Sequence, residues 1–223
     1  MLNEPQNPDY ARELLGRYVS EPVASQALER GVPLGGETVH ASAMFVDLCE
    51  FTALTRRLPA AQVVELLNQY YAIVDDACEN QGGLITQFLG DGVIAVFGGP
   101  LRPVANHARR AVRAAVAVQR ALAERNADDE AERLQAGIGI CTGGMIAGNV
   151  GAGRRVTYTI VGDAVNQAAR LQEKTRGSDA SILVTESTRS AIGAADELAL
   201  RPFGMTTLKG LAAPIAVYAV EHS

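Results

Sequence analysis

Two aspartates stand where the chain could build a metal site. Asp47 ends the apolar segment 43–47, and Asp91 lies at the tip of a β-hairpin predicted for residues 84–97. Either residue alone would be typical of a helix cap or a turn. In a β-α-β-β arrangement, however, the two strands are neighbours and bring both carboxylates together. Carboxylate and backbone oxygens suit Mg²⁺ or Mn²⁺, which keep ligand positions for substrate phosphates, so the pairing favours a divalent-cation site.

A second polar pair lies on a helix predicted for residues 164–174. Asn166 and Arg170 are four positions apart, so their side chains project from the same face of that helix. One offers an amide, and the other a forked cation that suits phosphate oxygens. A capping Asn and a solvated Arg are the alternative. The glycine-rich segment just before the helix and the nearby Arg154 and Arg155 weaken that alternative.

The sequence lacks the residue patterns of several other kinds of active site. The phosphate-binding pattern G-x-x-x-x-G-K-[ST] and the nucleophile pattern G-x-S-x-G are absent, and the three histidines are scattered without ligand spacing. The three cysteines form no C-x-x-C pair, which predicts free thiols in a reducing compartment. Any metal should therefore be held by oxygen.

Composition narrows the class of protein further. The 223 residues are 48% hydrophobic and 20% charged, with a formal net charge of -5 spread along the chain. These values are typical of a soluble folded protein and argue against a general nucleic-acid surface. No segment approaches the roughly 20 apolar residues of a membrane helix, and the N-terminus lacks the features of a signal peptide. We therefore expect a cytoplasmic chain with no membrane segment and no nucleic-acid partner.

The elements that must position these residues follow the order β-α-β-β-α-β, which is that of a ferredoxin-like core. Glycines on both sides of Asp91 favour a tight hairpin turn there. Residues 1–37 differ, because they predict only two short helices, the second capped by Ser20, and so a helical linker before a domain at residues 38–223. The expected strands cover residues 39–48, 84–89, 93–97, 134–141, 145–150, 156–161 and 215–220, and the expected helices cover residues 9–18, 21–30, 59–80, 103–125 and 164–174.

Five segments follow one another over residues 38–220. They are FVDLCEFT (45–52), FLGDGVIAVF (88–97), GIGICTG (137–143), YTIVGDAVNQAAR (158–170) and LKG (208–210). In this order they resemble the catalytic domain of class III nucleotidyl cyclases. The resemblance implies an α+β fold within the broad α/β class, with a ferredoxin-like palm-type core and added C-terminal strands and helices. It also implies a head-to-tail homodimer with its active sites at the interface.

The resemblance gives each polar residue of these segments a role. Asp47 and Asp91 match the ligands of two Mg²⁺ or Mn²⁺ ions per active site, and Leu48 matches a position whose backbone carbonyl also reaches a metal. Asn166 matches the residue that orients the ribose, and Arg170 the one that stabilises the reacting phosphate. The remaining matches bind the substrate: Lys209 and Arg154 at the phosphates, and Gln87 and Thr159 at the purine. One chain would supply the metal ligands and the Arg154 position, and its partner the others.

The implied reaction converts ATP to 3′,5′-cyclic AMP and pyrophosphate, with two metal ions assisting attack of the 3′-hydroxyl on the α-phosphate. Family adenylyl cyclases usually carry Lys at the position of Gln87, and Asp or Thr at that of Thr159. The amide of Gln87 and the hydroxyl of Thr159 can each donate or accept, which implies weak selection between ATP and GTP.

Three alternatives stay open or are weakened by the sequence. The domain could be a relaxed or guanylyl-preferring cyclase, or a cyclase-like regulatory module that binds nucleotide without turnover. A diguanylate cyclase would show a G-G-[DE]-E-F hairpin, whereas this chain has LGDG at residues 89–92. The segment before residue 38 resembles the connector of receptor-type cyclases, which leaves open whether the chain is the cytosolic part of a longer protein.

Overall fold

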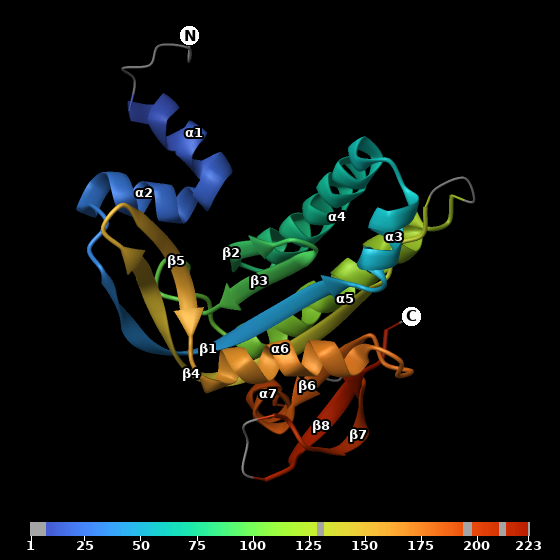
Figure 1. The fold of residues 1–223 in the computed structure, drawn as a ribbon. Helices are drawn as coiled ribbons and strands as arrows, with labels where there is room; N and C mark the ends of the chain where they lie inside the picture. Colours follow the sequence, from blue (N-terminus) through green and yellow to red (C-terminus); the bar gives the residue numbers. More distant parts are fainter. Residues whose placement is uncertain (1–7, 129–131, 194–197, 210–212, 223) are drawn as a thin grey trace.

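The computed structural model describes residues 8–128, 132–193, 198–209 and 213–222. Figure 1 shows the elements in their chain order. They are α1 (Pro8–Val19), α2 (Glu21–Arg30), β1 (Gly35–Leu48), α3 (Phe51–Arg57), α4 (Ala60–Asn80), β2 (Gly83–Leu89), β3 (Gly92–Phe97), α5 (His107–Arg125), β4 (Ala136–Ala152), β5 (Arg155–Val161), α6 (Asp163–Thr175), β6 (Ile182–Thr185), α7 (Glu186–Ile192), β7 (Leu200–Thr206) and β8 (Ile215–Val220).

One mixed sheet runs through the described part of the chain. Its strands have the order β2-β3-β1-β4-β6-β8-β7, and β5 pairs with β4 (Figure 1). The first four strands in that order are antiparallel neighbours, and α4 and α5 make the connections from β1 to β2 and from β3 to β4. This is the βαββαβ pattern of a ferredoxin-like core. The predicted α+β fold is confirmed, with β6, α7, β7 and β8 as the added C-terminal elements.

Both faces of the sheet are covered, because the core strands carry apolar side chains on both sides. On one face, α4 and α5 pack on the sheet, where Tyr70 and Met44 are fully buried. On the other face, α6 and β5 pack on the sheet, where Ala168 and Ala43 are fully buried. Side chains alternate along a strand. Asp47 therefore projects on the same face as Ala43, toward α6.

Strand β4 is longer than the sequence pattern predicts. The pattern gives two strands, at residues 134–141 and 145–150, but the structure joins them into one. Gly143 and Gly144 lie between the two predicted strands and stay paired with β1, so the ladder continues through them. The long β1 partner thus overrides the local sequence signal. Helix α5 also begins later than predicted, at His107.

The N-terminal segment forms both predicted helices, α1 and α2. Ser20 occupies the predicted N-cap position of α2, but its side chain makes no capping hydrogen bond, and its hydroxyl is buried without a partner among the described residues. A capping residue normally has an extended backbone with negative φ, whereas Ser20 has a φ of 75° at the elbow between the helices. Val23 of α2 packs against the sheet domain, while Leu14 and Tyr18 of α1 are exposed.

None of the helices in the described ranges is both long enough and apolar enough to span a lipid bilayer.

Candidate active site

Asp47 is held near the end of β1 by both neighbouring strands. It pairs with Gly92 at the start of β3 and with Gly137 near the start of β4. Its side chain is 18% exposed. Glycine at the paired position leaves space beside the carboxylate, since a Cβ on Gly92 would lie 3.5 Å from Asp47 Oδ1. The strand ladder thus fixes the backbone of Asp47 and leaves its carboxylate accessible.

Asp91 forms the tip of the hairpin between β2 and β3. Gly90 has a φ of 64°, which confirms the predicted glycine-assisted turn. Helix α4 supports this turn: the Tyr71 hydroxyl donates to the Gly90 carbonyl, and the Tyr71 ring centre lies 4.5 Å from that of Phe88. The hairpin therefore presents Asp91 beside the end of β1.

The two carboxylates interact electrostatically. Burial, and after it the negative charge of Asp47, raises the pKa of the Asp91 carboxyl above its ordinary value. Burial is also the main reason that the pKa of the Tyr70 hydroxyl is raised, with Asp47 and Asp91 adding to the shift. A cation placed between the carboxylates would offset their repulsion.

The donor set fits a hard divalent cation. In the described ranges there is no cluster of three or more His, Cys, Asp or Glu side chains that could hold a metal by itself. Asp47 and Asp91 offer only carboxylate oxygens, and the backbone carbonyl of Leu48 is next to Asp47 in sequence. A few oxygen ligands suit Mg²⁺ or Mn²⁺, which fill their other positions with water or phosphate.

Two further residues reach Asp47 that the sequence patterns did not single out. The Arg176 guanidinium forms an ion pair with Asp47 Oδ2, and Gln172 Nε2 donates to the same oxygen at 3.5 Å. Gln172 lies on α6, and Arg176 directly follows that helix. A cation at a helix C-terminus usually complements the helix dipole. Because an arginine at this position is common for that reason, the sequence alone did not indicate that Arg176 belongs to the site.

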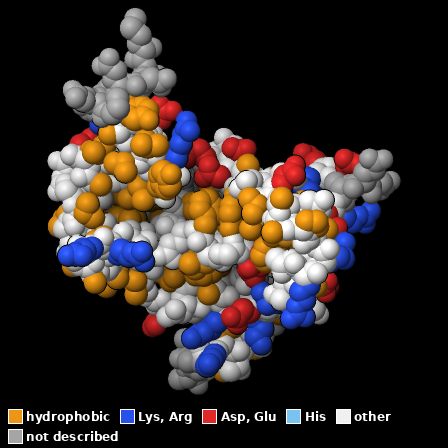
Figure 2. Space-filling model, turned by 45° about the horizontal axis from the view of Figure 1, so that its top comes forward, with side chains coloured by type: hydrophobic (Ala, Val, Ile, Leu, Met, Phe, Trp, Pro, Cys, Tyr) orange, Lys and Arg blue, Asp and Glu red, His pale blue; other side chains and the backbone are white. Residues whose placement is uncertain are grey.

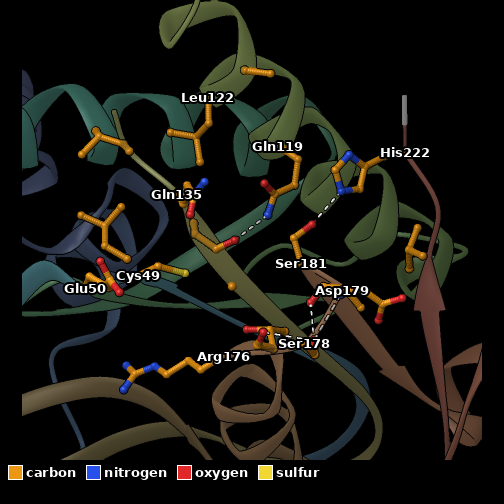
Figure 3. A pocket seen from close by; sticks show the side chains of 18 of the residues that line it. Cys49, Glu50, Gln119, Leu122, Gln135, Arg176, Ser178, Asp179, Ser181 and His222 are labelled. Carbon is orange, nitrogen blue, oxygen red and sulfur yellow. Dashed lines mark hydrogen bonds between the residues drawn. The ribbon is translucent and has the colours of Figure 1, made fainter. Parts of the chain in front are cut away.

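A cleft of about 1020 Å³ opens beside the end of β1 (Figure 3), and Leu48, but not Asp47, is among the residues that line it. Asp91 lines it, and Cys49 and Glu50 lie at one end of it. At the other end, Ser181 is hydrogen-bonded to His222 at 2.7 Å, and burial lowers the pKa of this imidazole. The cleft is large enough to admit a nucleotide-sized ligand.

The predicted purine-reading residue Thr159 lies far from Asp47 within one chain. Thr159 pairs with Gly148 of β4, whereas Asp47 pairs with Gly137 of the same strand. These two β4 positions are about 36 Å apart along the strand. The two residues therefore lie at opposite ends of the sheet, and Figure 1 shows β5 away from the end of β1 that precedes α3.

Helix α6 also separates the predicted residues. Asn166 is exposed in its first turn and Arg170 is half-buried in its middle. Asn166 lies about 14 Å along the helix axis from Thr175, the helix end that reaches Asp47. The structure therefore does not bring Asn166 together with Asp47 inside one chain.

The remaining predicted residues lie on three separate segments. Arg154 is exposed in the turn between β4 and β5. Lys209 is exposed after β7 and follows the buried Leu208, while Gly210 of the same motif lies outside the described residues. Gln87 on β2 is half-buried and lines a second cavity of about 710 Å³ between the α1–α2 elbow and β2.

Comparison with known proteins identifies the class of protein that this fold and site define. Residues 36–222 match the model of the adenylate and guanylate cyclase catalytic domain. An uncharacterized protein of Mycobacterium tuberculosis is 43% identical over 191 residues, which cover 86% of this chain and 35% of that protein. A second protein of that organism is 40% identical over 205 residues, covering 92% of this chain and 35% of that protein. The chain belongs to the class III adenylyl and guanylyl cyclase family, and it spans about a third of the length of these curated relatives.

Solved structures share the fold. The adenylyl cyclase CyaB from P. aeruginosa is 32% identical with a TM-score of 0.74, covering 84% of this chain and 97% of that one. The guanylyl cyclase Cya2 is 30% identical with a TM-score of 0.75, covering 85% and 95%. A bacterial light-regulated adenylyl cyclase is 27% identical with a TM-score of 0.81, covering 95% and 60%. This chain is thus a nucleotidyl cyclase domain, and its fold is shared by cyclases of either base.

Proposed function

We propose that this domain is an adenylyl cyclase, which converts ATP to 3′,5′-cyclic AMP and pyrophosphate with two Mg²⁺ or Mn²⁺ ions per site. The observation that carries the proposal is the pair Asp47 and Asp91, which adjacent strands bring together, with Asp91 lining a nucleotide-sized cleft. In the reaction, the ribose 3′-oxygen forms a bond to the α-phosphorus while the bond to the pyrophosphate oxygen breaks. The proton of the 3′-hydroxyl leaves to solvent.

The proposed roles follow from the chemistry of each side chain. Bound metal supplies positive charge that lowers the pKa of the attacking hydroxyl and offsets the charge of the triphosphate. Asp47 and Asp91 hold that metal, with the backbone carbonyl of Leu48. Asn166 orients the ribose, and Arg170 stabilises charge at phosphorus, a role in which losing one donor typically costs about 3 to 4 kcal/mol. Lys209 and Arg154 bind phosphate oxygens, and Gln87 and Thr159 read the purine.

The separation of these residues within one chain supports a shared site. Asp47 and Thr159 lie at opposite ends of the sheet, so one compact nucleotide cannot reach both in a single chain. A head-to-tail homodimer, with two equivalent sites, joins the metal ligands of one chain to Thr159, Asn166 and Arg170 of the other.

Exposed apolar side chains support the same arrangement. Figure 2 shows hydrophobic side chains gathered from the N-terminal helices toward the centre of the view. On strands β2, β4 and β5, large hydrophobic residues are about half exposed: Phe88, Leu89, Ile146, Val150 and Val161. Exposed apolar surface of this kind is typical of a surface that another protein covers.

We further propose that residues 1–37 form a connector ahead of a catalytic domain at residues 38–223. The packing of Val23 from α2 on the sheet domain supports a connector that touches the domain it precedes. A nucleoside triphosphate substrate and three free cysteines support a cytoplasmic location.

The proposal leaves a choice between ATP and GTP as the preferred substrate. The amide of Gln87 and the hydroxyl of Thr159 can satisfy either purine, and the family includes both adenylyl and guanylyl cyclases. A cyclase that also uses GTP is therefore the second candidate function.

The decisive experiment incubates the purified chain with ATP or GTP and Mn²⁺ and identifies the products by chromatography and mass spectrometry. We expect cyclic AMP and pyrophosphate in equal amounts, with a smaller yield of cyclic GMP. A larger yield of cyclic GMP would replace adenylyl by guanylyl specificity. Nucleotide binding without any cyclic product would leave a regulatory module in place of an enzyme.

A further inference from the structure

Arg176 forms an ion pair with Asp47, one of the two proposed metal ligands. Its guanidinium pairs with Asp47 Oδ2, and Gln172 Nε2 lies 3.5 Å from the same oxygen. The other oxygen, Oδ1, lies on the side of the hairpin glycine Gly92. A guanidinium paired with Oδ2 takes up part of the negative charge of this carboxylate, and two cations beside one carboxylate repel each other. Arg176 therefore competes with a metal ion for Asp47.

The fold places Arg176 there through close packing of α6 on β4. A Cβ on Gly137, the β4 partner of Asp47, would lie 2.0 Å from Thr175 Oγ1. A Cβ on Gly139 would lie 2.1 Å from the Ala168 carbonyl oxygen. The absence of side chains at these glycines thus lets the end of α6 lie directly beside the end of β1.

The backbone of Arg176 is held by hydrogen bonds, whereas its side chain is largely exposed. Its amide donates to the Glu173 carbonyl, and the Ser178 amide donates to the Thr175 carbonyl, so the helix end is closed by hydrogen bonds on both sides of Arg176. In contrast, the Arg176 side chain is 58% exposed. Ion pairs that are this exposed contribute little to stability. The guanidinium can therefore leave Asp47 by a side-chain rotation, without movement of the helix.

We propose that Arg176 is an exchangeable counter-cation of Asp47, which a divalent metal ion must displace before the site is fully loaded. This inference rests on the proposed metal-binding role of Asp47 and Asp91. Arg176 is then a positioning residue that sets the metal concentration the domain needs. Arg176 lines the cleft on the same side as Cys49 and Glu50 (Figure 3).

Direct Mn²⁺ binding tests the exchange without reference to turnover. Free Mn²⁺ would be measured by electron paramagnetic resonance during titration of the wild type, Arg176→Ala and Arg176→Lys. We expect Arg176→Ala to bind Mn²⁺ about 1.5-fold to fivefold more tightly, because an exposed ion pair no longer competes. Arg176→Lys, which keeps the charge, should fall between them.

Arg201→Ala is the matched control. Arg201 lines the same cleft, but it pairs with Asp179 and Glu221 instead of Asp47. Its removal should leave Mn²⁺ affinity unchanged, which separates loss of a specific competitor from a general loss of positive charge. Should Arg176→Ala fail to fold, Arg176→Gln keeps a polar side chain and carries the test.

The outcomes are distinct. Tighter binding in Arg176→Ala than in the wild type, with no change in Arg201→Ala, supports the exchange. Unchanged or weaker binding in Arg176→Ala, with normal binding in the wild type, overturns it, and weaker binding would make Arg176 a support of the Asp47 orientation. No Mn²⁺ binding by any of the proteins overturns the metal site itself, and the exchange with it.

Discussion

The two ends of the sheet differ in how far a single chain completes them. At one end, Asp47 and Asp91 lie together and Arg176 contacts Asp47, with α4 bracing the hairpin and α6 reaching the carboxylate. At the other end, Thr159 is only half-buried and Asn166 is exposed. The end that carries the proposed metal ligands, here called the metal end, is preorganised by contacts within the chain. The end that carries the proposed nucleoside-binding residues, here called the nucleoside end, presents its groups to the outside.

This difference has a physical cause. Two carboxylates repel each other, so they can be held close only by a rigid backbone, here two antiparallel strands joined to a glycine turn. An exposed Asn or Thr carries no such cost and needs no support until a ligand arrives. The chain thus builds the part of the site that is electrostatically costly. The part that reads the substrate is left to an encounter between chains in the proposed dimer.

Removing a carboxylate from the metal end should have the largest effect. Asp47→Ala or Asp91→Ala should lower kcat by about 10³-fold or more, because metal assistance supplies several kcal/mol of transition-state stabilisation. Asp76→Ala, at an exposed position of α4, is the control. Its kcat should stay within about twofold of wild type, because surface substitutions usually have small effects. Activity within tenfold of wild type in either site variant would sink the assignment.

Mixing two inactive variants tests whether the two ends work together across chains. Equal amounts of Asp47→Ala and Arg170→Ala should recover about a quarter of wild-type activity, since half of randomly paired dimers are mixed and one of their two sites is intact. A mixture of Asp47→Ala with Asp91→Ala should remain inactive, because both substitutions damage the same end. If subunit exchange is demonstrated and the first mixture also stays inactive, the site lies within one chain.

The metal end was largely predictable from the sequence, and for a clear reason. Asp47 and Asp91 fall in strand and turn patterns that are local, and the βαββαβ order makes their strands neighbours. Arg176 was not predictable in the same way. Its contact with Asp47 depends on how closely α6 packs on β4, which is a long-range property that no residue pattern near position 176 reports.

The nucleoside end shows the opposite limit. The resemblance to cyclases implies roles for Thr159, Asn166 and Lys209, and Asn166 and Lys209 are exposed in the structure. The elements that carry them were still predictable: α6 and β5 lie within a residue or two of their expected positions. Continuous pairing of β4 was missed because glycines within the strand mimic a break, and pairing with β1 carries the strand through them.

Base selection offers a test of intermediate size at the nucleoside end. We expect a wild-type ratio of kcat/KM for ATP over GTP of about ten to a hundred, and Gln87→Lys should raise this ratio by about tenfold. An ammonium can only donate, so it would leave the N1–H donor of guanine without an acceptor. Gln87→Leu is the matched variant, since it removes the amide without adding charge. It should lower kcat/KM for both nucleotides and leave their ratio near the wild-type value.

Steady-state kinetics with both nucleotides in all three proteins measures these ratios. A wild-type ratio above about 10⁴ would show that other buried polar groups fix the base. In that case the nucleoside end would be as strongly preorganised as the metal end, and the contrast between the two ends would fail.

The smallest expected effect concerns helix α6, which carries Asn166 near one end and reaches Asp47 at the other. Gly139 of β4 lies under the middle of this helix, where an added Cβ would meet the Ala168 carbonyl oxygen at 2.1 Å and the Gln172 amide nitrogen at 2.4 Å. Gly139→Ala should therefore lower the free energy of unfolding by about 1 to 3 kcal/mol, and Tm by about 2 to 12 °C for a chain of this length.

Gly144→Ala in the same strand adds a Cβ that has no neighbour within 4 Å, so its Tm should stay close to that of the wild type. Calorimetry on both variants makes the comparison, and equal Tm values would mean that α6 is not packed on β4 as closely as the glycines require. Higher Mn²⁺ affinity in Gly139→Ala, but not in Gly144→Ala, would show that the same helix packing also positions Arg176 on Asp47.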